Sequence, residues 1–187
     1  WGRPRSLSRQ PSASWPSWRG DEGTAGGGRH EDPRLENARE GDLHPRQVLR
    51  ELENAMPKNA MVSTDIGNIN AIANSYLRFE SPRSFFAPMS FGNCGYAFPT
   101  IIGAKVASPD RPAISYAGDG AWTMSMVETM TCVRHKIPVT AVVFHNRQWG
   151  AEKKNQVDFY DQRFVADELE GQDFVAIAKA MGAEGIK

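Results

Sequence analysis

The sequence predicts an α/β fold, in which a parallel sheet is flanked by helices on both faces in the doubly wound arrangement. Short apolar runs rich in β-branched residues alternate along the chain with segments whose apolar residues recur at helical spacing. The connections between successive strands are long enough to hold a crossover helix. Strands joined through helices lie parallel, and the helices then cover both faces of the sheet.

Two helices and one strand are predicted before residue 80. Proline suits the first turn of a helix, and Pro45 opens one whose apolar residues share a face: Val48, Leu49, Leu52, Ala55 and Met56. Met61–Thr64 is a short apolar strand. A second helix starts after the glycine turn at 67–68, and its apolar face holds Ile69, Ile72, Ala73 and Tyr76.

The same alternation continues to the end of the chain. A third helix is predicted over about 96–107, followed by a strand at Ala113–Gly118. One further helix would carry Trp122, Met126, Met130 and Val133, stop at 135–138 and lead into a strand at 139–144. A last helix would carry Phe174, Ile177, Ala178 and Met181. Another strand is expected from residue 186, so we expect the fold to be incomplete at both ends relative to a parent enzyme.

Composition argues against several classes of partner. The 22 basic and 22 acidic side chains balance, which indicates neither nucleic acid nor an anionic membrane surface as a partner. No apolar stretch approaches the roughly 20 residues that cross a bilayer. Cys94 and Cys132 show no metal-type spacing and indicate no disulfide framework, so a reduced, cytoplasmic setting is expected.

Residues 1–43 differ from the rest of the chain. They contain no Ile, Val, Phe, Met, Tyr, Cys or Lys, and their seven basic side chains are all Arg. Such a segment cannot bury enough apolar surface to offset its ordering entropy. Arg without Lys is typical of translated GC-rich non-coding sequence, so we interpret 1–43 as a disordered or non-native leader rather than a targeting segment. The predicted domain is therefore 44–187.

Two polar residues define the predicted site. Asp119 lies in a Gly-Asp-Gly turn that ends one predicted strand, and Asn146 follows the next strand 27 positions later. A strand–helix–strand unit places two parallel strands side by side, so both residues emerge at the same carboxyl edge. A carboxylate and an amide oxygen beside a helix N-terminus suit a hard divalent cation that carries a diphosphate.

Three further stretches are predicted to reach the same edge. The turn at 64–68 contains Gly67, which allows close backbone approach, although taken on its own the turn is better interpreted as a helix cap. The stretch 90–99 is rich in glycine. The polar and aromatic stretch 145–160 is too long for an ordinary connection. There His145 is either a general acid/base or a strand-end histidine satisfied by its neighbours.

The Gly-Asp-Gly motif, followed about 25 to 30 residues later by Asn, resembles the signature of thiamine-diphosphate enzymes. That family usually has two consecutive Asn, and here the first is His145. The resemblance implies a Mg²⁺ ion held by Asp119, Asn146 and the backbone carbonyl of Gln148. It implies that thiamine diphosphate is bound by Ile66, Gly67, Asn68, Ile69, Gly92, Asn93, Cys94, Gly118, Asp119, Gly120, Ala121, Asn146 and Gln148. Cys94 stands where the family has a Met that props the thiazolium.

Within that family, three stretches carry a narrower resemblance. They are GDGAW, SFGNCGYAFPTIIGA and HNRQWGAEKKNQVDFY. Over residues 44–187 the chain resembles the sulfoacetaldehyde acetyltransferases, in the acetolactate synthase and pyruvate oxidase branch. The resemblance implies conversion of sulfoacetaldehyde and phosphate into acetyl phosphate and sulfite via acetyl-thiamine diphosphate. It also implies small-molecule substrates and a homo-oligomeric parent enzyme, a dimer or tetramer.

The resemblance assigns no catalytic acid or base to this chain. In the family, a Glu from an N-terminal domain of a neighbouring subunit protonates the aminopyrimidine, and nothing in 1–43 matches that domain. We therefore expect the chain to supply half of the cofactor site and to be inactive alone. Lys153, Lys154 or Arg163 is our candidate receptor for sulfonate or phosphate. Three alternatives stay open: an acetolactate synthase-like enzyme using pyruvate, a non-catalytic half-domain that binds cofactor or a partner, and an ordinary doubly wound domain with a fortuitous Gly-Asp-Gly.

Overall fold

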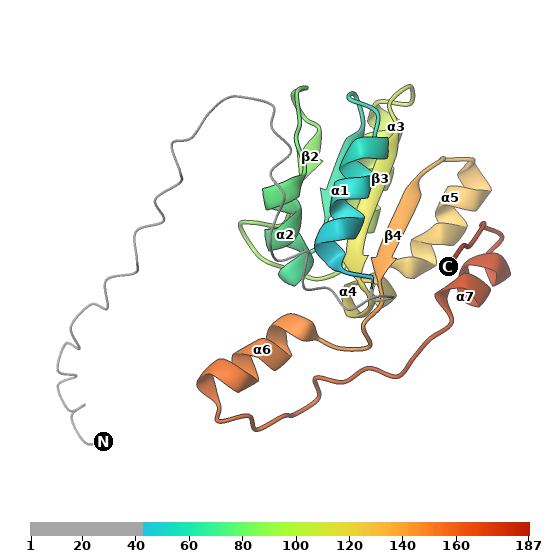
Figure 1. Cartoon of the computed structure of the whole chain (residues 1–187). Coiled ribbons are helices and arrows are strands. Elements are labelled where there is room, and N and C mark those ends of the chain that lie inside the picture. The colour runs from blue at the N-terminus through green and yellow to red at the C-terminus, as the bar shows by residue number, and fades with distance from the viewer. Residues whose placement is uncertain (1–42) are drawn as a thin grey trace, which may run out of the picture. The chain divides into compact units, whose positions relative to one another are not determined.

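The sheet is four-stranded and all-parallel. The structure is a computed structural model, and it describes residues 43–187; apart from Leu43, the predicted leader lies outside the described residues. The strands are β1 (Met61–Thr64), β2 (Phe85–Phe86), β3 (Ala113–Gly118) and β4 (Thr140–Phe144), in the spatial order β2-β1-β3-β4 (Figure 1). The predicted parallel sheet is confirmed. The two-residue β2 was not predicted, because it is too short to show an alternating pattern.

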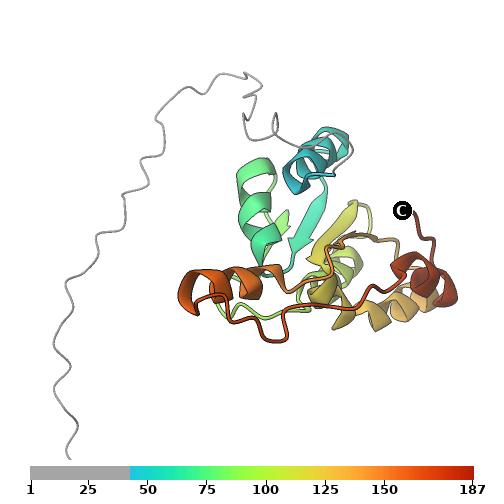
Figure 2. The same ribbon diagram turned by 60° about the horizontal axis from the view of Figure 1, so that its bottom comes forward.

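Helices cover both faces of this sheet, as predicted (Figure 2). The helices are α1 (Pro45–Ala55), α2 (Asn68–Tyr76), α3 (Ala97–Ala107), α4 (Asp119–Thr123), α5 (Thr129–His135), α6 (Gly150–Phe159) and α7 (Phe174–Ala180), with a 3₁₀ turn at Met126–Glu128. Alternate residues of β1 and β3 point to opposite sides. Val62 and Tyr116 pack under α1 and α2, whereas Met61 and Ala117 pack under α3 and α4.

The pairing of β3 with β4 sets the position of the predicted site. The two strands are parallel and in register, with Gly118 opposite Phe144. Asp119 and His145 are therefore the first residues beyond each strand end, and Asn146 follows directly. This confirms the prediction that the Gly-Asp-Gly turn and Asn146 emerge at the same edge of the sheet.

The prediction of a single helix after the Gly-Asp-Gly turn is wrong. The chain instead forms α4, the 3₁₀ turn and α5, and the break falls at Ser125, whose φ of −133° and ψ of 0° lie outside the helical region. Trp122 is buried and packs edge-on against Phe98, but Met130 is 54% exposed. The spacing of apolar residues did not reveal the break, because it contains neither Gly nor Pro.

The stretch 145–160, which was predicted to be too long for an ordinary connection, contains a helix. Its second half forms α6, which lies apart from the sheet in Figure 1 and has no buried residue. Its sequence shows no amphipathic periodicity, because neither side of the helix faces a core. The segment 160–173 then runs back beneath the sheet to α7. We call this segment the return arm.

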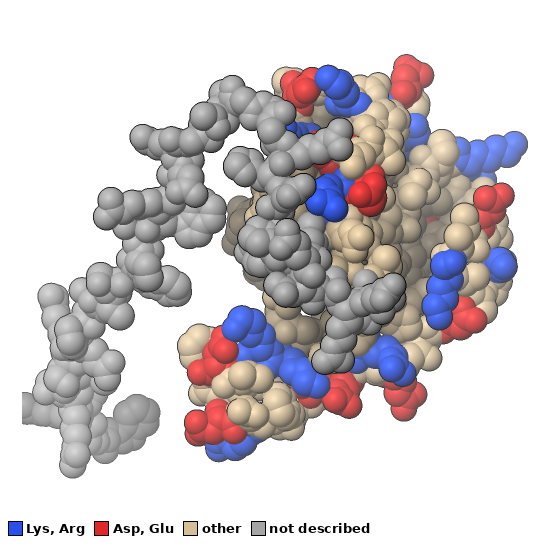
Figure 3. Space-filling view, viewed as in Figure 1, with Lys and Arg blue, Asp and Glu red and all other residues tan. Residues whose placement is uncertain are grey.

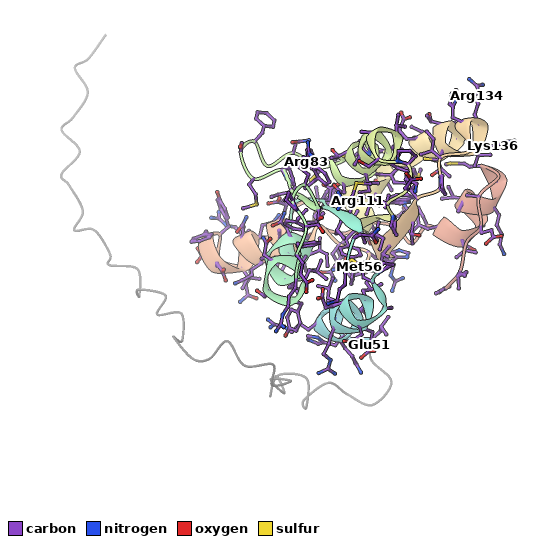
Figure 4. The ribbon with its side chains drawn as sticks, turned by 90° about the horizontal axis from the view of Figure 1, so that it is seen from above. Glu51, Met56, Arg83, Arg111, Arg134 and Lys136 are labelled. Atoms are coloured by element: carbon purple, nitrogen blue, oxygen red, sulfur yellow. The ribbon has the colours of Figure 1, made fainter. Side chains whose placement is uncertain are left out.

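The end of the sheet opposite the predicted site is held by Arg111, just before β3 (Figure 4). Its guanidinium donates to the carbonyl oxygen of Asn59 at 2.8 Å and to the hydroxyl of Ser84. Charges of both signs are interspersed over the face seen in Figure 3. Among the described helices, none is long and apolar enough to cross a membrane.

Asp65 connects the end of β1 to the start of α3. Its buried carboxylate accepts hydrogen bonds from the backbone N–H groups of Ile66 (3.0 Å), Gly95 (3.0 Å) and Ala97 (2.9 Å). Burial raises the pKa of Asp65, while these N–H donors lower it. A helix cap at 64–68 was expected, and the structure shows that Asp65 caps α3 rather than α2, which begins in the next residues.

Replacing Asp65 with Ala should lower the free energy of unfolding by about 1–3 kcal/mol, because three N–H donors lose their acceptor. Asp110→Ala, at an exposed position in a turn, is the matched control and should change it by less than about 0.5 kcal/mol. Urea unfolding followed by circular dichroism measures both. Equal stability of the two variants would contradict this role of Asp65.

Candidate functional site

A cavity of about 500 Å³ opens at the carboxyl edge of the sheet. That volume lies within the range of small-molecule sites. The predicted residues that line it are Ile66, Gly67, Asn68, Ile69, Gly92, Cys94, Gly118, Asp119, Gly120, Ala121, Asn146 and Gln148. Asn93 is exposed and does not line it. The structure therefore brings together residues from turns that lie up to about 80 positions apart in the sequence.

Asp119 joins the ends of β3 and β4. Its side chain is buried; Oδ1 accepts from the N–H of Gly120 at 2.9 Å and Oδ2 from the N–H of Arg147 at 2.6 Å. The second bond ties the segment after β4 to the end of β3. A carboxylate oxygen has two lone pairs, so each oxygen keeps capacity for a further partner.

The segment after β4 turns sharply between the two other predicted metal ligands. Arg147, which lies between Asn146 and Gln148, has a φ of +57°, a left-handed conformation that costs a non-glycine residue about 1 kcal/mol. The side-chain oxygen of Asn146 accepts from the N–H of Gln148 at 3.2 Å. This strained turn holds Asn146 and Gln148 beside Asp119.

The return arm pairs with the same segment. Gln148 and Glu168 form an antiparallel bridge, in which the N–H of Trp149 donates to Asp167 and the N–H of Leu169 donates to Arg147, both at 2.8 Å. In this kind of antiparallel bridge, the residues on either side of the paired residues make the backbone hydrogen bonds. The N–H and C=O of Gln148 therefore face away from the arm, and its carbonyl is not used by the pairing.

This donor set fits Mg²⁺. A carboxylate, an amide oxygen and a backbone carbonyl are hard oxygen ligands, and Mg²⁺ fills its remaining positions with water and phosphate oxygens. Within residues 43–187 there is no group of three His, Cys, Asp or Glu side chains suited to a metal. The predicted ligand set differs from such a group, because Asp119 is its single carboxylate. The other negative charges around Mg²⁺ would come from the diphosphate.

Two glycine turns also line the cavity, in addition to Asp119, Asn146 and Gln148. Gly67, the residue before α2, has a φ of +118°, and Gly92 has a φ of +73°. Side chains rarely adopt either conformation, and no atom lies within 4 Å of where a Cβ would stand at either position. These turns let a ligand approach the backbone directly, which suits a phosphate-bearing cofactor.

Trp149 was not predicted as a site residue. A Cβ on Gly120 would lie 2.7–2.9 Å from three atoms of its ring, so the ring lies directly against the Gly-Asp-Gly turn. The amide of Gly120, one of the residues that the resemblance assigns to the cofactor, donates to Asp119. The sequence contains one indication of this contact. Glycine is required at position 120 only if another group lies too close for a side chain, and that group is the ring of Trp149.

His145 is held between two neighbours. Its Nε2 lies 3.8 Å from Oδ2 of Asp119, and its ring packs edge-on against Phe174 with 4.9 Å between centroids. These contacts favour the interpretation of a strand-end histidine satisfied by its surroundings.

Cys94 lines the cavity without being activated as a nucleophile. Burial raises the pKa of its thiol, and the carboxylates of Asp65 and Glu152 raise it further. The thiol is therefore neutral near pH 7 and acts as a small apolar group. A Cys in this position fills less volume than a Met.

Two of the three candidate anion receptors are already paired. Lys153 lies 3.1 Å from Glu168 and 3.4 Å from Asp167, and Lys154 lies 2.6 Å from Asp158. The guanidinium of Arg163 donates to the carbonyl of Tyr160 at 3.2 Å, and that bond leaves its positive charge unneutralised.

Comparison with known proteins identifies the family and supports the fold. Residues 65–187 match the family described as "Thiamine pyrophosphate enzyme, C-terminal TPP binding domain". The chain belongs to this family. The match includes the Gly-Asp-Gly turn, Asn146 and Gln148, and it overturns the alternative of an ordinary domain with a fortuitous motif.

Individual relatives refine this assignment. The chain is 82% identical over 144 residues to the sulfoacetaldehyde acetyltransferase of Castellaniella defragrans, covering 77% of this chain and 24% of the relative. It is 35% identical over 150 residues to the acetolactate synthase large subunit of Parasynechococcus marenigrum, covering 79% of this chain and 24% of that relative. Among solved structures, the thiamine diphosphate-dependent 4-hydroxybenzoylformate decarboxylase of Rhodococcus jostii RHA1 superposes with a TM-score of 0.72 at 26% identity, covering 77% and 27%. The chain thus spans about a quarter of the length of these relatives.

Gly120→Ala should displace the ring of Trp149, because the new Cβ overlaps three ring atoms. The near-UV circular dichroism of Trp149, obtained by difference from a Trp149→Phe variant, should change. Gly103→Ala, inside α3 with no atom within 4 Å of the new Cβ, is the control; it should leave this signal intact and raise stability by about 0.5–1 kcal/mol. An unchanged Trp149 signal in Gly120→Ala would contradict the contact.

Proposed function

We propose that residues 44–187 form the Mg²⁺–diphosphate half of the cofactor site of a sulfoacetaldehyde acetyltransferase. One observation carries the proposal: the ends of β3 and β4 bring Asp119 together with Asn146 and Gln148 at one cavity. The 82% identity to the Castellaniella defragrans enzyme supports the substrate, and the family supports thiamine diphosphate. The reaction is the conversion of sulfoacetaldehyde and phosphate into acetyl phosphate and sulfite.

Each wall of the cavity has a distinct task in this proposal. Asp119, Asn146 and the carbonyl of Gln148 hold Mg²⁺, which neutralises the diphosphate. The turn at 66–69 and the residues 118–121 contact the phosphates. The carbonyl of Gly92 accepts from the aminopyrimidine, with Asn93 beside it, and Cys94 props the thiazolium. When bound, thiamine diphosphate supplies the carbanion chemistry, while this chain binds and orients it.

The proposal assigns no proton transfer to this chain. Cys94 is neutral, and the only carboxylate among the predicted ligands is committed to backbone donors and the metal. In this proposal the acid comes from a second subunit of a homo-oligomer, so residues 44–187 alone are inactive. Because both lysines of α6 are paired with carboxylates, Arg163 is the remaining candidate to receive a substrate anion.

Asp119→Ala should weaken Mg²⁺-dependent binding of thiamine diphosphate on the order of a hundredfold or more, because it removes the only charged ligand of the set. Asn146→Ala, which disturbs one local hydrogen bond, should weaken it while leaving the fold intact. Isothermal titration calorimetry with and without Mg²⁺ measures the affinity, and Asp110→Ala is the control. Wild-type affinity in both site variants would overturn the metal assignment.

The substrate is tested in a chimaera. Residues 44–187 replace the matching segment of the Castellaniella defragrans enzyme, and sulfite and acetyl phosphate are measured with thiamine diphosphate, Mg²⁺ and phosphate. Both products should form from sulfoacetaldehyde, and pyruvate should not be consumed in parallel reactions. Pyruvate consumption without sulfite would establish an acetolactate synthase-like activity. Tight cofactor binding without any turnover would establish a non-catalytic half-domain.

A further inference from the structure

One lysine connects α6 to the return arm. The ammonium of Lys153 lies 3.4 Å from Oδ2 of Asp167 and 3.1 Å from Oε1 of Glu168, and 5.3 Å from the centre of the Phe164 ring. The hydrogen bond that Lys153 donates to Glu168 raises the pKa of Lys153, and the Asp167 charge contributes as well. We call Lys153, Phe164, Asp167 and Glu168 the lysine clasp. It lies outside the set of residues that hold the cofactor in the proposed function.

Asp167 is the centre of the clasp. Its side chain is only 5% exposed, whereas that of Glu168 is 78% exposed. Within the described residues, Oδ2 of Asp167 accepts no hydrogen bond of good geometry, and the ammonium of Lys153 is its one ion-pair partner. A solvent-exposed pair contributes little, but a buried carboxylate deprived of its cation is strongly unfavourable. The link between Lys153 and Asp167 therefore matters more than the shorter contact with Glu168.

The backbone of Asp167 also contacts residues 147–149, which include the proposed metal ligand Gln148. Its carbonyl accepts from the N–H of Trp149, and two residues later Leu169 donates to the carbonyl of Arg147. These two bonds enclose Gln148. The same peptide chain that carries Gln148 is tied on its other side to Asp119, through the N–H of Arg147.

We propose that Lys153 is a positioning residue: by holding Asp167, it fixes the return arm against residues 147–149 and so holds the carbonyl of Gln148 in place as a metal ligand. The inference rests on the proposed function only in its last step, the use of that carbonyl by Mg²⁺. The clasp itself is a property of the chain and is testable without any ligand.

A second contact supports the arm farther from the site. Gln156 of α6 accepts from the N–H of Val165 at 2.6 Å and donates to its carbonyl at 3.0 Å. This pair fixes the beginning of the arm but makes no bond to 147–149. Loss of Lys153 should therefore release the part of the arm at 167–169 and leave the part at 165 attached to α6.

The test compares Lys153→Met, Lys153→Arg and Lys154→Met in the full 187-residue chain. Methionine keeps the length of the side chain and removes the charge that faces Asp167, whereas arginine keeps the charge. Lys154 is the matched control, because it is the next residue of the same helix and pairs only with the half-exposed Asp158 among the described residues. Hydrogen exchange of the Trp149 and Leu169 amides is measured without ligand, and Mg²⁺ is then titrated at saturating thiamine diphosphate.

In Lys153→Met the two amides should exchange about tenfold faster or more, and the Mg²⁺ affinity should fall on the order of tenfold, as for other groups that orient a metal ligand. Lys153→Arg should restore both values, and Lys154→Met should change neither. A merely structural role would lower the thermal unfolding midpoint but leave the Mg²⁺ affinity of the folded chain unchanged.

Two results would overturn the inference. Wild-type exchange at Trp149 and Leu169 in Lys153→Met would show that the clasp does not hold the arm. Faster exchange with an unchanged Mg²⁺ affinity would show that the arm does not position Gln148. If the wild-type chain binds no Mg²⁺ with thiamine diphosphate, the proposed function fails, while the exchange data still decide whether the clasp exists.

Discussion

Two buried carboxylates at the ends of adjacent parallel strands hold the functional edge of this sheet together. Asp65 follows β1 and accepts three backbone N–H groups, and Asp119 follows β3 and accepts two. Strand ends and helix starts leave backbone donors that water would otherwise satisfy. A carboxylate without a nearby cation is costly to bury, and these converging donors offset that cost. The turns that line the cavity have their geometry because of these bonds.

Asp119 illustrates how one group serves both structure and chemistry. Its bonds to Gly120 and Arg147 fix the distance between the end of β3 and the segment after β4. The same bonds orient the carboxylate so that its remaining lone pairs are available at the cavity. In the proposed function, this orientation lets Asp119 bind Mg²⁺ without rearrangement, which favours affinity. The left-handed conformation of Arg147 is the strain that this arrangement stores.

The described part of the chain contains two kinds of element. The sheet and its covering helices share two apolar clusters, whereas α6 has no buried residue and the return arm is held by hydrogen bonds and ion pairs. Elements of the second kind open at lower free energy than a core does. Residues 146–148 lie where the two kinds of element meet, so their geometry depends on contacts outside the sheet.

The sequence by itself determined the alternation of strands and helices, the three longer strands and the meeting of Asp119 with Asn146. All of these follow from local periodicity and from the rule that parallel strands end at one edge. Tertiary structure alone decided the break at Ser125, the helix α6, the capping of α3 by Asp65 and the contact of Trp149 with Gly120. Each of these depends on groups distant in sequence or on the absence of a core against one side of a helix. Such causes leave no repeating pattern in the sequence, because a single long-range hydrogen bond or ring contact has no period.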